Sequence, residues 1–366
     1  MTRDGDADAH ARPLPRDVTF ALAACGLVIL AGQIALGTDK ALHFPPDQLL
    51  RGLLAIVGLD APLPHQALLQ IRVCSALTSA GVGACLAVAG ALLQGLLRNP
   101  LADPSLLGVT SGASLGATAA LLALGGIAPL VVREGLGELG PWLVSGAALV
   151  GALLVTGIVV ILGQRLTGRG GIAMLVLLGV ALNSCMAGAI AAVQDGLFAA
   201  QRLDLLGALQ AWSMGALHER QPYHVLMVAC GVFAAVLVIP RVARELDLLA
   251  GGDDDARSLG VDVTRVRVLV VVTAAFATAC AVAAAGPIGF VGLVVPQVVR
   301  LAVGASHRRV LWLTLLGGAV FVPGLDLLQL VVLGERTFRP NVQMTLLGGT
   351  FFLALLFARS RSRLAW

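Results

Sequence analysis

The stretch GALLQGLLRNPLADPSLLGVTSGASLG, residues 90–116, joins two apolar segments through a short polar corner. Pro100 and Pro104 lack a backbone N–H, and each disfavours the helical conformation in the residue before it. The sequence therefore predicts that one helix ends before this corner and that another begins after it, with Asn99 and Asp103 capping free N–H groups. Broken backbone at membrane depth is tolerated only where it is buried in protein or lines a water-filled path. The stretch favours a transport protein over a simple membrane anchor.

The composition of the chain is that of an integral membrane protein. Of its 366 residues, 58% are hydrophobic and 13% are charged, whereas a soluble domain carries about 25% charged residues. The 44 glycines are in keeping with this class, because small residues let membrane helices approach closely. We therefore predict an all-α, polytopic membrane protein.

Apolar segments of spanning length recur along residues 18–360. The predicted spans are 18–37, 70–97, 105–125, 141–163, 172–194, 222–240, 266–286, 289–303, 309–333 and 343–358. A hydropathy average could merge the two spans on either side of Gly286-Pro287 and give nine. We count ten because the merged stretch carries Arg at both ends. Residues 1–17 are polar and are predicted to form a disordered cytoplasmic tail.

The distribution of basic residues predicts the orientation. Ten spans place both termini on one side of the membrane. If that side is the cytoplasm, about two thirds of the 25 Lys and Arg residues lie inside, as the positive-inside rule requires. Nine spans would spoil this pattern from the eighth span onward, so the charges favour ten spans with both termini cytoplasmic.

The sequence contains no ATP-binding loop. A P-loop needs Lys followed by Ser or Thr after a Gly-rich turn, and the single lysine, Lys40, follows Asp39. The six cysteines include no CxxC pair, which gives no indication of a metal site. We therefore expect no enzyme activity, no cofactor and no metal in this chain.

The longest predicted inside loop is residues 241–267. It carries three consecutive acids, Asp253 to Asp255, and then Gly260. Acidic residues suit the positive end of a helix dipole, and glycine commonly ends a helix. The pattern predicts a short cytoplasmic helix, with a solvated charged connector as the alternative.

Two further features are polar or irregular within apolar spans. Residues 286–292, GPIGFVG, break a helix in mid-membrane; the break either serves packing alone or makes Pro287 and Gly289 part of a flexible element at a translocation path. Asn183 and Ser184 are expected to face the bundle or the path rather than lipid. Interhelical hydrogen bonding is the alternative for these two.

Three of these motifs together resemble the permeases of type II ABC importers, the FecCD or BtuC-like family. They are the stretch 90–116, LLAGGDDDARSLGVD at 248–262 and AGPIGFVGLVVPQVVR at 285–300, and the resemblance covers about residues 18 to 360. It implies a BtuC-like fold of ten transmembrane helices in the bacterial cytoplasmic membrane. The implied function is import of a ferric siderophore, with haem or cobalamin as alternative substrates.

The resemblance also implies the partners. ATP and Mg would be bound by a dimer of separate ATP-binding subunits. A second permease copy, identical or paralogous, would complete the path, and a substrate-binding protein would deliver the ferric siderophore or similar chelate. Membrane lipid would surround the assembly, and no nucleic acid is expected to take part.

The family's site positions fall on particular residues of this sequence. Asn99 and Leu101 match positions that narrow the inner mouth of the path. The predicted cytoplasmic helix matches the coupling helix that seats in the ATPase subunit. Its residues assigned to coupling are Asp253, Arg257, Leu259 and Gly260, the first three facing the partner.

Arginines that dock the binding protein are less well matched. Arg72 corresponds to the first Arg of the family's Arg-Leu-Pro-Arg run, but the second is missing. A later family Arg position falls on Leu330, and Arg336 and Arg339 follow within a few residues. Arginine suits this task because its pairs with carboxylates can be bidentate.

Two other functions remain open at this stage. A secondary transporter usually needs acids within the membrane to couple ions, and Asp326 is the clear candidate. A receptor or scaffold would not require the broken helices at Pro100 and Pro287. Co-purification with an ATPase would separate an ABC permease from both.

Overall fold

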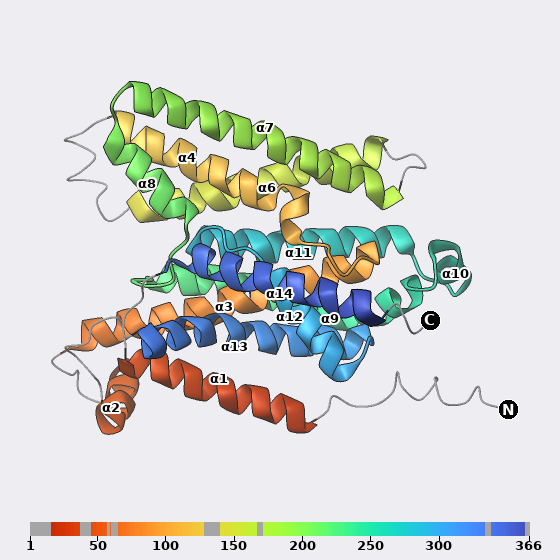
Figure 1. The fold of residues 1–366 in the computed structure, drawn as a ribbon, viewed down its shortest axis with the longest axis horizontal. Coiled ribbons are helices and arrows are strands. Elements are labelled where there is room, and N and C mark those ends of the chain that lie inside the picture. The colour runs from red at the N-terminus through yellow and green to blue at the C-terminus, as the bar shows by residue number, and fades with distance from the viewer. Residues whose placement is uncertain are drawn as a thin grey trace.

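In a computed structural model of the chain, the structure describes residues 16–36, 45–56, 59, 65–127, 140–166, 171–333 and 338–362. Within these ranges all regular secondary structure is helical (Figure 1). The predicted cytoplasmic tail lies outside the described residues except for its last two, which begin the first helix.

Ten helices coincide with the ten predicted spans. They are α1 (Arg16–Leu36), α3 (Gln66–Leu97), α4 (Val109–Ile127), α6 (Gly140–Leu166), α7 (Gly171–Ala199), α9 (Pro222–Leu249), α11 (Val263–Ala285), α12 (Val291–Val303), α13 (His307–Leu333) and α14 (Pro340–Ser362). Seven of the described helices are long and apolar enough to cross a membrane, and α4 and α12 are shorter apolar helices. The prediction of a polytopic all-α protein is confirmed.

Four short helices join or interrupt the long ones: α2 (Pro46–Ile56), η2 (Pro104–Leu107), α8 (Leu203–Ser213) and α10 (Asp253–Ser258). In Figure 1, α2 and α8 lie at one end of the bundle and α10 lies at the other. The first residue of α1 and the last described residue of α14 lie at the α10 end. This arrangement is the one that an even number of crossings requires.

Helix α3 runs through the centre of the bundle and packs against α9, α11, α12 and α13. Glycines set its distance from two of these neighbours. A Cβ on Gly83 would collide with the carbonyl of Gly318 in α13, and a Cβ on Gly90 would lie 2.6 Å from the Cα of Gly292 in α12. Such direct backbone contact is what small residues provide between membrane helices.

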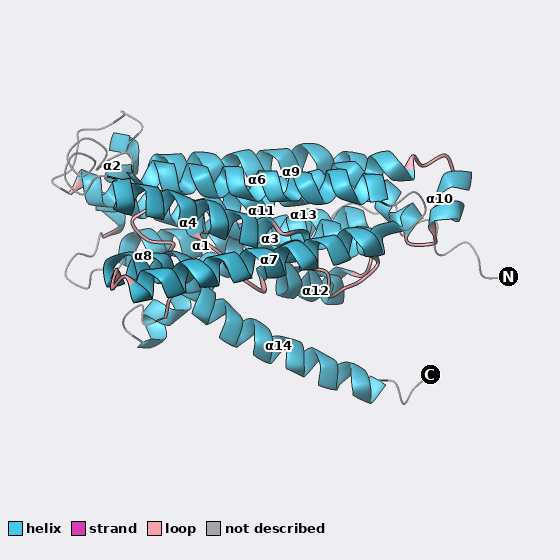
Figure 2. Cartoon of the chain, turned by 90° about the horizontal axis from the view of Figure 1, so that it is seen from above, coloured by secondary structure: helices cyan, strands magenta, loops and turns pink. Residues whose placement is uncertain are grey.

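The helices form two groups, a bundle around α3 and a separate layer that packs against α11. Helices α4, α6, α7 and α8 form one layer (Figure 1), in which Gly112 of α4 lies against the backbone of Gly151 in α6. Helix α11 contacts both α4 and α6 and so joins this layer to the bundle around α3. Helix α14 leaves the bundle at an angle (Figure 2) and packs mainly against α12.

One predicted boundary was wrong. We expected the sixth span to end at Pro240 and the cytoplasmic loop to begin at residue 241, but α9 continues through Pro240 to Leu249. Proline removes one helical hydrogen bond without necessarily ending a membrane helix, because neighbouring groups can compensate. Beyond the proline, Val242, Leu246 and Leu249 are buried, and this packing favours continued helix.

Candidate functional site

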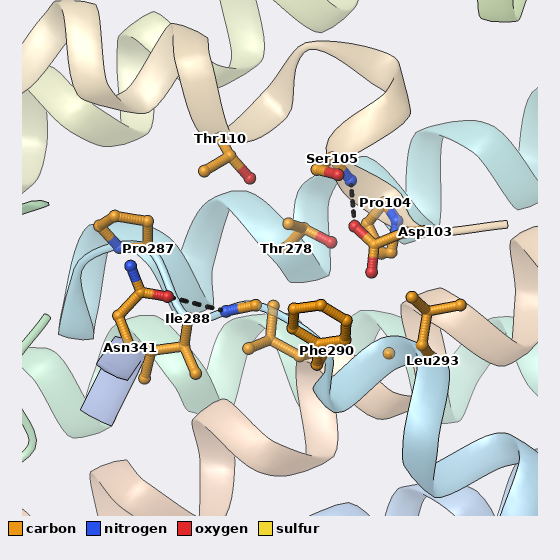
Figure 3. A pocket seen from close by; sticks show the side chains of 13 residues that line it. Asp103, Pro104, Ser105, Thr110, Thr278, Pro287, Ile288, Phe290, Leu293 and Asn341 are labelled. Atoms are coloured by element: carbon orange, nitrogen blue, oxygen red, sulfur yellow. Dashed lines mark hydrogen bonds between the residues drawn. The ribbon is translucent and has the colours of Figure 1, made fainter. Parts of the chain in front are cut away.

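A cavity of about 360 Å³ lies between the two predicted helix breaks (Figure 3). One wall is the corner after α3, and the other is the break between α11 and α12. Its lining residues are Leu86, Asp103, Pro104, Ser105, Thr110, Thr278, Pro287, Ile288, Gly289, Phe290, Gly292, Leu293 and Asn341. Two stretches that the sequence singled out separately therefore face each other across one space.

The first break is capped as the sequence predicted. Helix α3 ends at Leu97, and the residue that follows it, Arg98, adopts a left-handed conformation with φ 49°. The side chain of Asn99 accepts a hydrogen bond from the N–H of Leu101 at 2.9 Å. Asp103 accepts one from the N–H of Ser105, also at 2.9 Å, and so caps η2. The N–H groups of Leu101 and Ser105 are therefore satisfied by side chains of the corner itself.

The second break is held from two sides. Gly286 has φ 77°, and Phe290 has φ 64°, a conformation that is costly for an aromatic residue. The N–H of Ala216 donates to the carbonyl of Ala285 at 2.8 Å. On the other side, the amide oxygen of Asn341 accepts a hydrogen bond from the N–H of Gly289 at 3.4 Å. These partners compensate for the helical bonds that are lost at the break.

Gln94, buried in α3, links that helix to both ends of α12. Its Nε2 donates to the carbonyl of Gly292 at 3.0 Å, and its Oε1 accepts from Arg300 Nη1 at 2.6 Å. The short helix that follows the second break is therefore anchored to the helix that precedes the first break. Sequence reasoning missed Gln94 because nothing in its neighbourhood marks a polar partner 198 residues away.

Of the residues predicted for the translocation path, some line the cavity and others do not. Pro287 and Gly289 line the cavity. Asn183 does not line it: its Nδ2 donates to the carbonyl of Ser105 at 2.9 Å and holds η2 in place. This geometry matches the alternative of interhelical hydrogen bonding. Ser184 is exposed on α7 and donates to Val180 O of its own helix.

Asn99 and Leu101 are exposed and lie outside the lining of this cavity. Arg98 beside them forms an ion pair with Asp253 of α10 at 2.7 Å. The corner after α3 is thus connected to α10. Sequence reasoning did not single out three polar residues of the lining. Thr110 lies within the stretch 90–116, and Thr278 and Asn341 are isolated polar residues that belong to none of the three motifs.

The predicted cytoplasmic helix is present as α10. Asp253 at its start pairs with Arg98 and also with Arg267 of α11, so its carboxylate points into the bundle. Arg257 and Leu259 are exposed and point outward. Gly260 follows the helix with φ 85°, a conformation that favours glycine.

At the opposite end, the docking candidates also differ in accessibility. Arg72 is only 6% exposed, and its Nη1 donates to Ile34 O and Ala35 O at the end of α1, at 3.3 and 3.1 Å. Arg339 is exposed, and its Nη1 donates to Ala211 O at 3.2 Å. Arg336 lies outside the described residues. Of the two docking candidates that the structure describes, Arg339 is exposed and Arg72 is buried.

Asp326 is buried in α13, with 3% of its surface exposed. Gln33 Nε2 donates to its Oδ2 at 2.9 Å, and His218 Nε2 lies 3.2 Å from its Oδ1. These groups border a second cavity of about 350 Å³ at the α2 end, which Arg72 also lines. In the part of the chain that the structure describes, no three His, Cys, Asp or Glu side chains are grouped to hold a metal ion.

Comparison with known proteins gives concordant results. A model of the FecCD transport family matches residues 22–358. The cobalamin import system permease protein BtuC of Halobacterium salinarum is 38% identical over 286 residues, which cover 78% of this chain and 72% of that protein. The hemin transport system permease protein HmuU of Yersinia pestis is 35% identical over 296 residues, 81% of this chain and 84% of that protein.

A solved structure of a metal-chelate type ABC transporter in an inward-facing conformation has the same fold. Its TM-score to this chain is 0.75 at 24% identity, over 94% of this chain and 99% of that chain. At this identity the match supports the fold and carries no information on substrate.

Proposed function

The chain belongs to the FecCD transport family and is a multi-pass permease of the ABC importer type; from this premise we propose that it carries a ferric siderophore across the bacterial cytoplasmic membrane. It performs no covalent chemistry in this proposal. A separate ATPase dimer binds ATP and Mg, a second permease copy completes the path, and a substrate-binding protein loads it.

The observation that carries the proposal is the cavity between the two broken helices. Irregular backbone within a membrane protein is tolerated where it is buried or lines a water-filled space, and both breaks border this cavity. The Gly286–Phe290 break is held on one side by Asn341 of α14, a helix whose described residues pack mainly against α12. A modest displacement of α14 would therefore alter one wall of the cavity.

The polar side chains of the lining support an oxygen-rich chelate as the substrate. Hydroxyl, carboxylate and amide groups face the space from Ser105, Thr110, Thr278, Asp103 and Asn341 (Figure 3). Phe290 is the aromatic residue of the lining. A ferric siderophore presents polar atoms over much of its surface, whereas haem has a broad apolar face that would be better matched by several aromatic rings. Hemin and cobalamin, which the two relatives' names specify, are the alternative substrates.

Coupling to the ATPase is assigned to α10. Arg257 and Leu259 are exposed and can face a partner, while Gly260 ends the segment. Asp253 faces the bundle and is ion-paired with Arg98, so we assign it the role of passing movement of α10 to the corner after α3. Asn99 and Leu101 at that corner would narrow the inner mouth.

Docking of the binding protein is assigned to Arg339 together with Arg336. Arg339 is exposed and donates to Ala211 O of α8, a helix at the end of the bundle opposite α10. Arg72 lies at the same end, but it is buried against the last carbonyls of α1. Its proposed part in docking is therefore indirect, through ordering that end of the bundle.

Reconstitution tests the function and the substrate together. The permease is co-purified with its ATPase, placed in liposomes with the binding protein, and offered a ferric hydroxamate, hemin or cobalamin. We expect uptake of the ferric chelate that requires ATP. Uptake of hemin or cobalamin instead would correct the substrate. Uptake that needs a proton gradient, no ATPase and an intact Asp326 would replace the proposal with a secondary transporter.

A further inference from the structure

A third cavity, of about 620 Å³, lies at the α10 end of the bundle. Its walls are the last turns of α9, the first turns of α11 and the segment that follows α10. It is separate from the cavity between the helix breaks, because the two share no lining residue. Its charged lining residues are Arg241, Arg244, Glu245, Asp262 and Arg265.

The charges of this lining do not cancel. Three guanidinium groups face two carboxylates, and Asp262 already caps α11 by accepting a hydrogen bond from the N–H of Arg265 at 3.0 Å. The guanidinium groups of Arg244 and Arg265 make no ion pair or hydrogen bond with any residue that the structure describes, and both residues are exposed. The cavity therefore presents cationic donors that remain available to an anion.

Apolar residues continue the cavity along the membrane-spanning part of both helices. On α9, Phe233 and Leu237 precede Arg241 at intervals of four residues, which places all three on one face. On α11, Val272 lies on the face of Arg265, seven residues further along. Phe233, Leu237 and Val272 are 63%, 44% and 49% exposed. Since α9 and α11 pack side by side, arginines at one end lead into an apolar surface.

We infer that this cavity binds the phosphate of an anionic phospholipid from the adjacent leaflet. The phosphate accepts hydrogen bonds from Arg244 and Arg265, and the acyl chains lie along Leu237, Phe233 and Val272. Basic pockets between membrane helices recognise anionic head groups in this way. The inference needs only that the chain spans a membrane, so it does not depend on the transported substrate.

A lipid fits this surface better than the ATPase subunit does. A soluble subunit could reach the rim, where Leu259 and Gly260 also line the cavity. It could not cover Phe233, which lies four turns before the end of α9 at Leu249 and therefore about 24 Å along the helix. An amphiphile covers both the charged and the apolar part.

The test is lipid binding to the purified permease–ATPase complex, measured by native mass spectrometry. The probes are phosphatidylglycerol, phosphatidylcholine with the same acyl chains, and glycerol phosphate. We expect phosphatidylglycerol to bind, phosphatidylcholine to bind weakly, and glycerol phosphate not to displace the lipid at equal concentration. Arg244→Gln/Arg265→Gln should weaken phosphatidylglycerol binding about 25-fold, or about fivefold for each arginine.

Arg308→Gln is the matched control, because Arg308 is exposed at the same end and lies outside the cavity. It should leave lipid binding unchanged. Leu237→Ser should weaken the binding of phosphatidylglycerol and leave the binding of glycerol phosphate as it is in the parent. The inference fails if the double variant binds phosphatidylglycerol like the parent, or if glycerol phosphate competes equally. It also fails if the double variant keeps the lipid and loses the ATPase subunit, since the cavity would then be a protein contact.

Discussion

At the scale of single residues, two glycines determine how closely α3 and α12 approach. Gly90 lies directly against Gly292, and no side chain separates the two backbones. Gln94, one turn later in α3, then reaches the carbonyl of Gly292 at 3.0 Å. The close approach and the hydrogen bond therefore depend on each other.

Gly90→Ala should destabilise the protein, because its Cβ would meet backbone atoms that cannot move independently. We expect a cost of roughly 1–3 kcal/mol or more from overpacking, seen as a lower melting temperature in detergent. Gly146→Ala is the matched control, because nothing lies within 4 Å of the Cβ position there. Equal melting temperatures for the two variants would contradict the proposed backbone contact.

Arg339→Ala should slow association with the binding protein. Charges at the rim of an interface act mainly on association rate and its salt dependence, so we expect a fall of roughly threefold to tenfold at low salt and little change at high salt. Surface plasmon resonance at several salt concentrations measures both. Arg308→Ala, at the opposite end, should behave like the parent; an unchanged rate in Arg339→Ala would remove this residue from the docking site.

At the scale of elements, α10 is a short helix fixed to the bundle by ion pairs and a buried side chain. Ala256 is completely buried, and its N–H donates to Gly252 O at 3.0 Å. Asp253 joins it to α3 and α11. Energetic coupling between the proposed ATPase subunit and the helix bundle requires a rigid element that contacts both of them.

Ala256→Pro should uncouple transport from ATP hydrolysis. Proline removes the hydrogen bond to Gly252 and costs about 3 kcal/mol within a helix, while the spans remain intact. The variant should insert and bind its binding protein, transport should fall, and ATPase activity should lose its response to the loaded binding protein.

Ala256→Gly is the control at the same position, since it keeps the N–H and fits the buried space. It should retain most of the transport activity. Normal transport by Ala256→Pro with the ATPase bound would mean that α10 is only a solvated connector.

The elements that could be predicted are those whose signal is local in sequence. Hydropathy located the apolar helices, and the arginines at both ends of residues 266–303 separated two helices that hydropathy alone could merge. Proline with glycine located the breaks near Pro104 and Pro287. Each of these features depends on adjacent residues. Helices α2 and α8 were not predicted: each is only 11 residues long, too short to register as a span among the polar connections.

The side-chain partners could not be predicted, because they come from distant parts of the chain. Asp253 pairs with Arg98 across 155 residues, and Asn183 reaches Ser105 across 78. The resemblance to type II ABC permeases implied that Asp253 faces the ATPase subunit. The carboxylate of Asp253 is instead drawn inward by two arginines that only the fold brings together.

At the scale of the whole molecule, the two ends of the bundle should face opposite sides of the membrane. With the six cysteines replaced by alanine, Gln201→Cys near α8 should react with an impermeant maleimide on intact cells. Ser258→Cys in α10 should react only after permeabilisation. The cysteine-free parent should not react at all. Labelling of both positions from outside would contradict the orientation drawn from the arginines.

The attachment of α14 has a consequence for how the protein is made. The N–H of Gly289 finds its acceptor on Asn341, and the ring of Phe290 lies where a side chain on Gly348 would be. A ribosome must therefore complete almost the entire chain before the break after α11 gains these contacts. Until then the nascent permease holds an unfinished helix junction in the bilayer, and messages that end before Asn341 should yield a product that quality-control proteases remove.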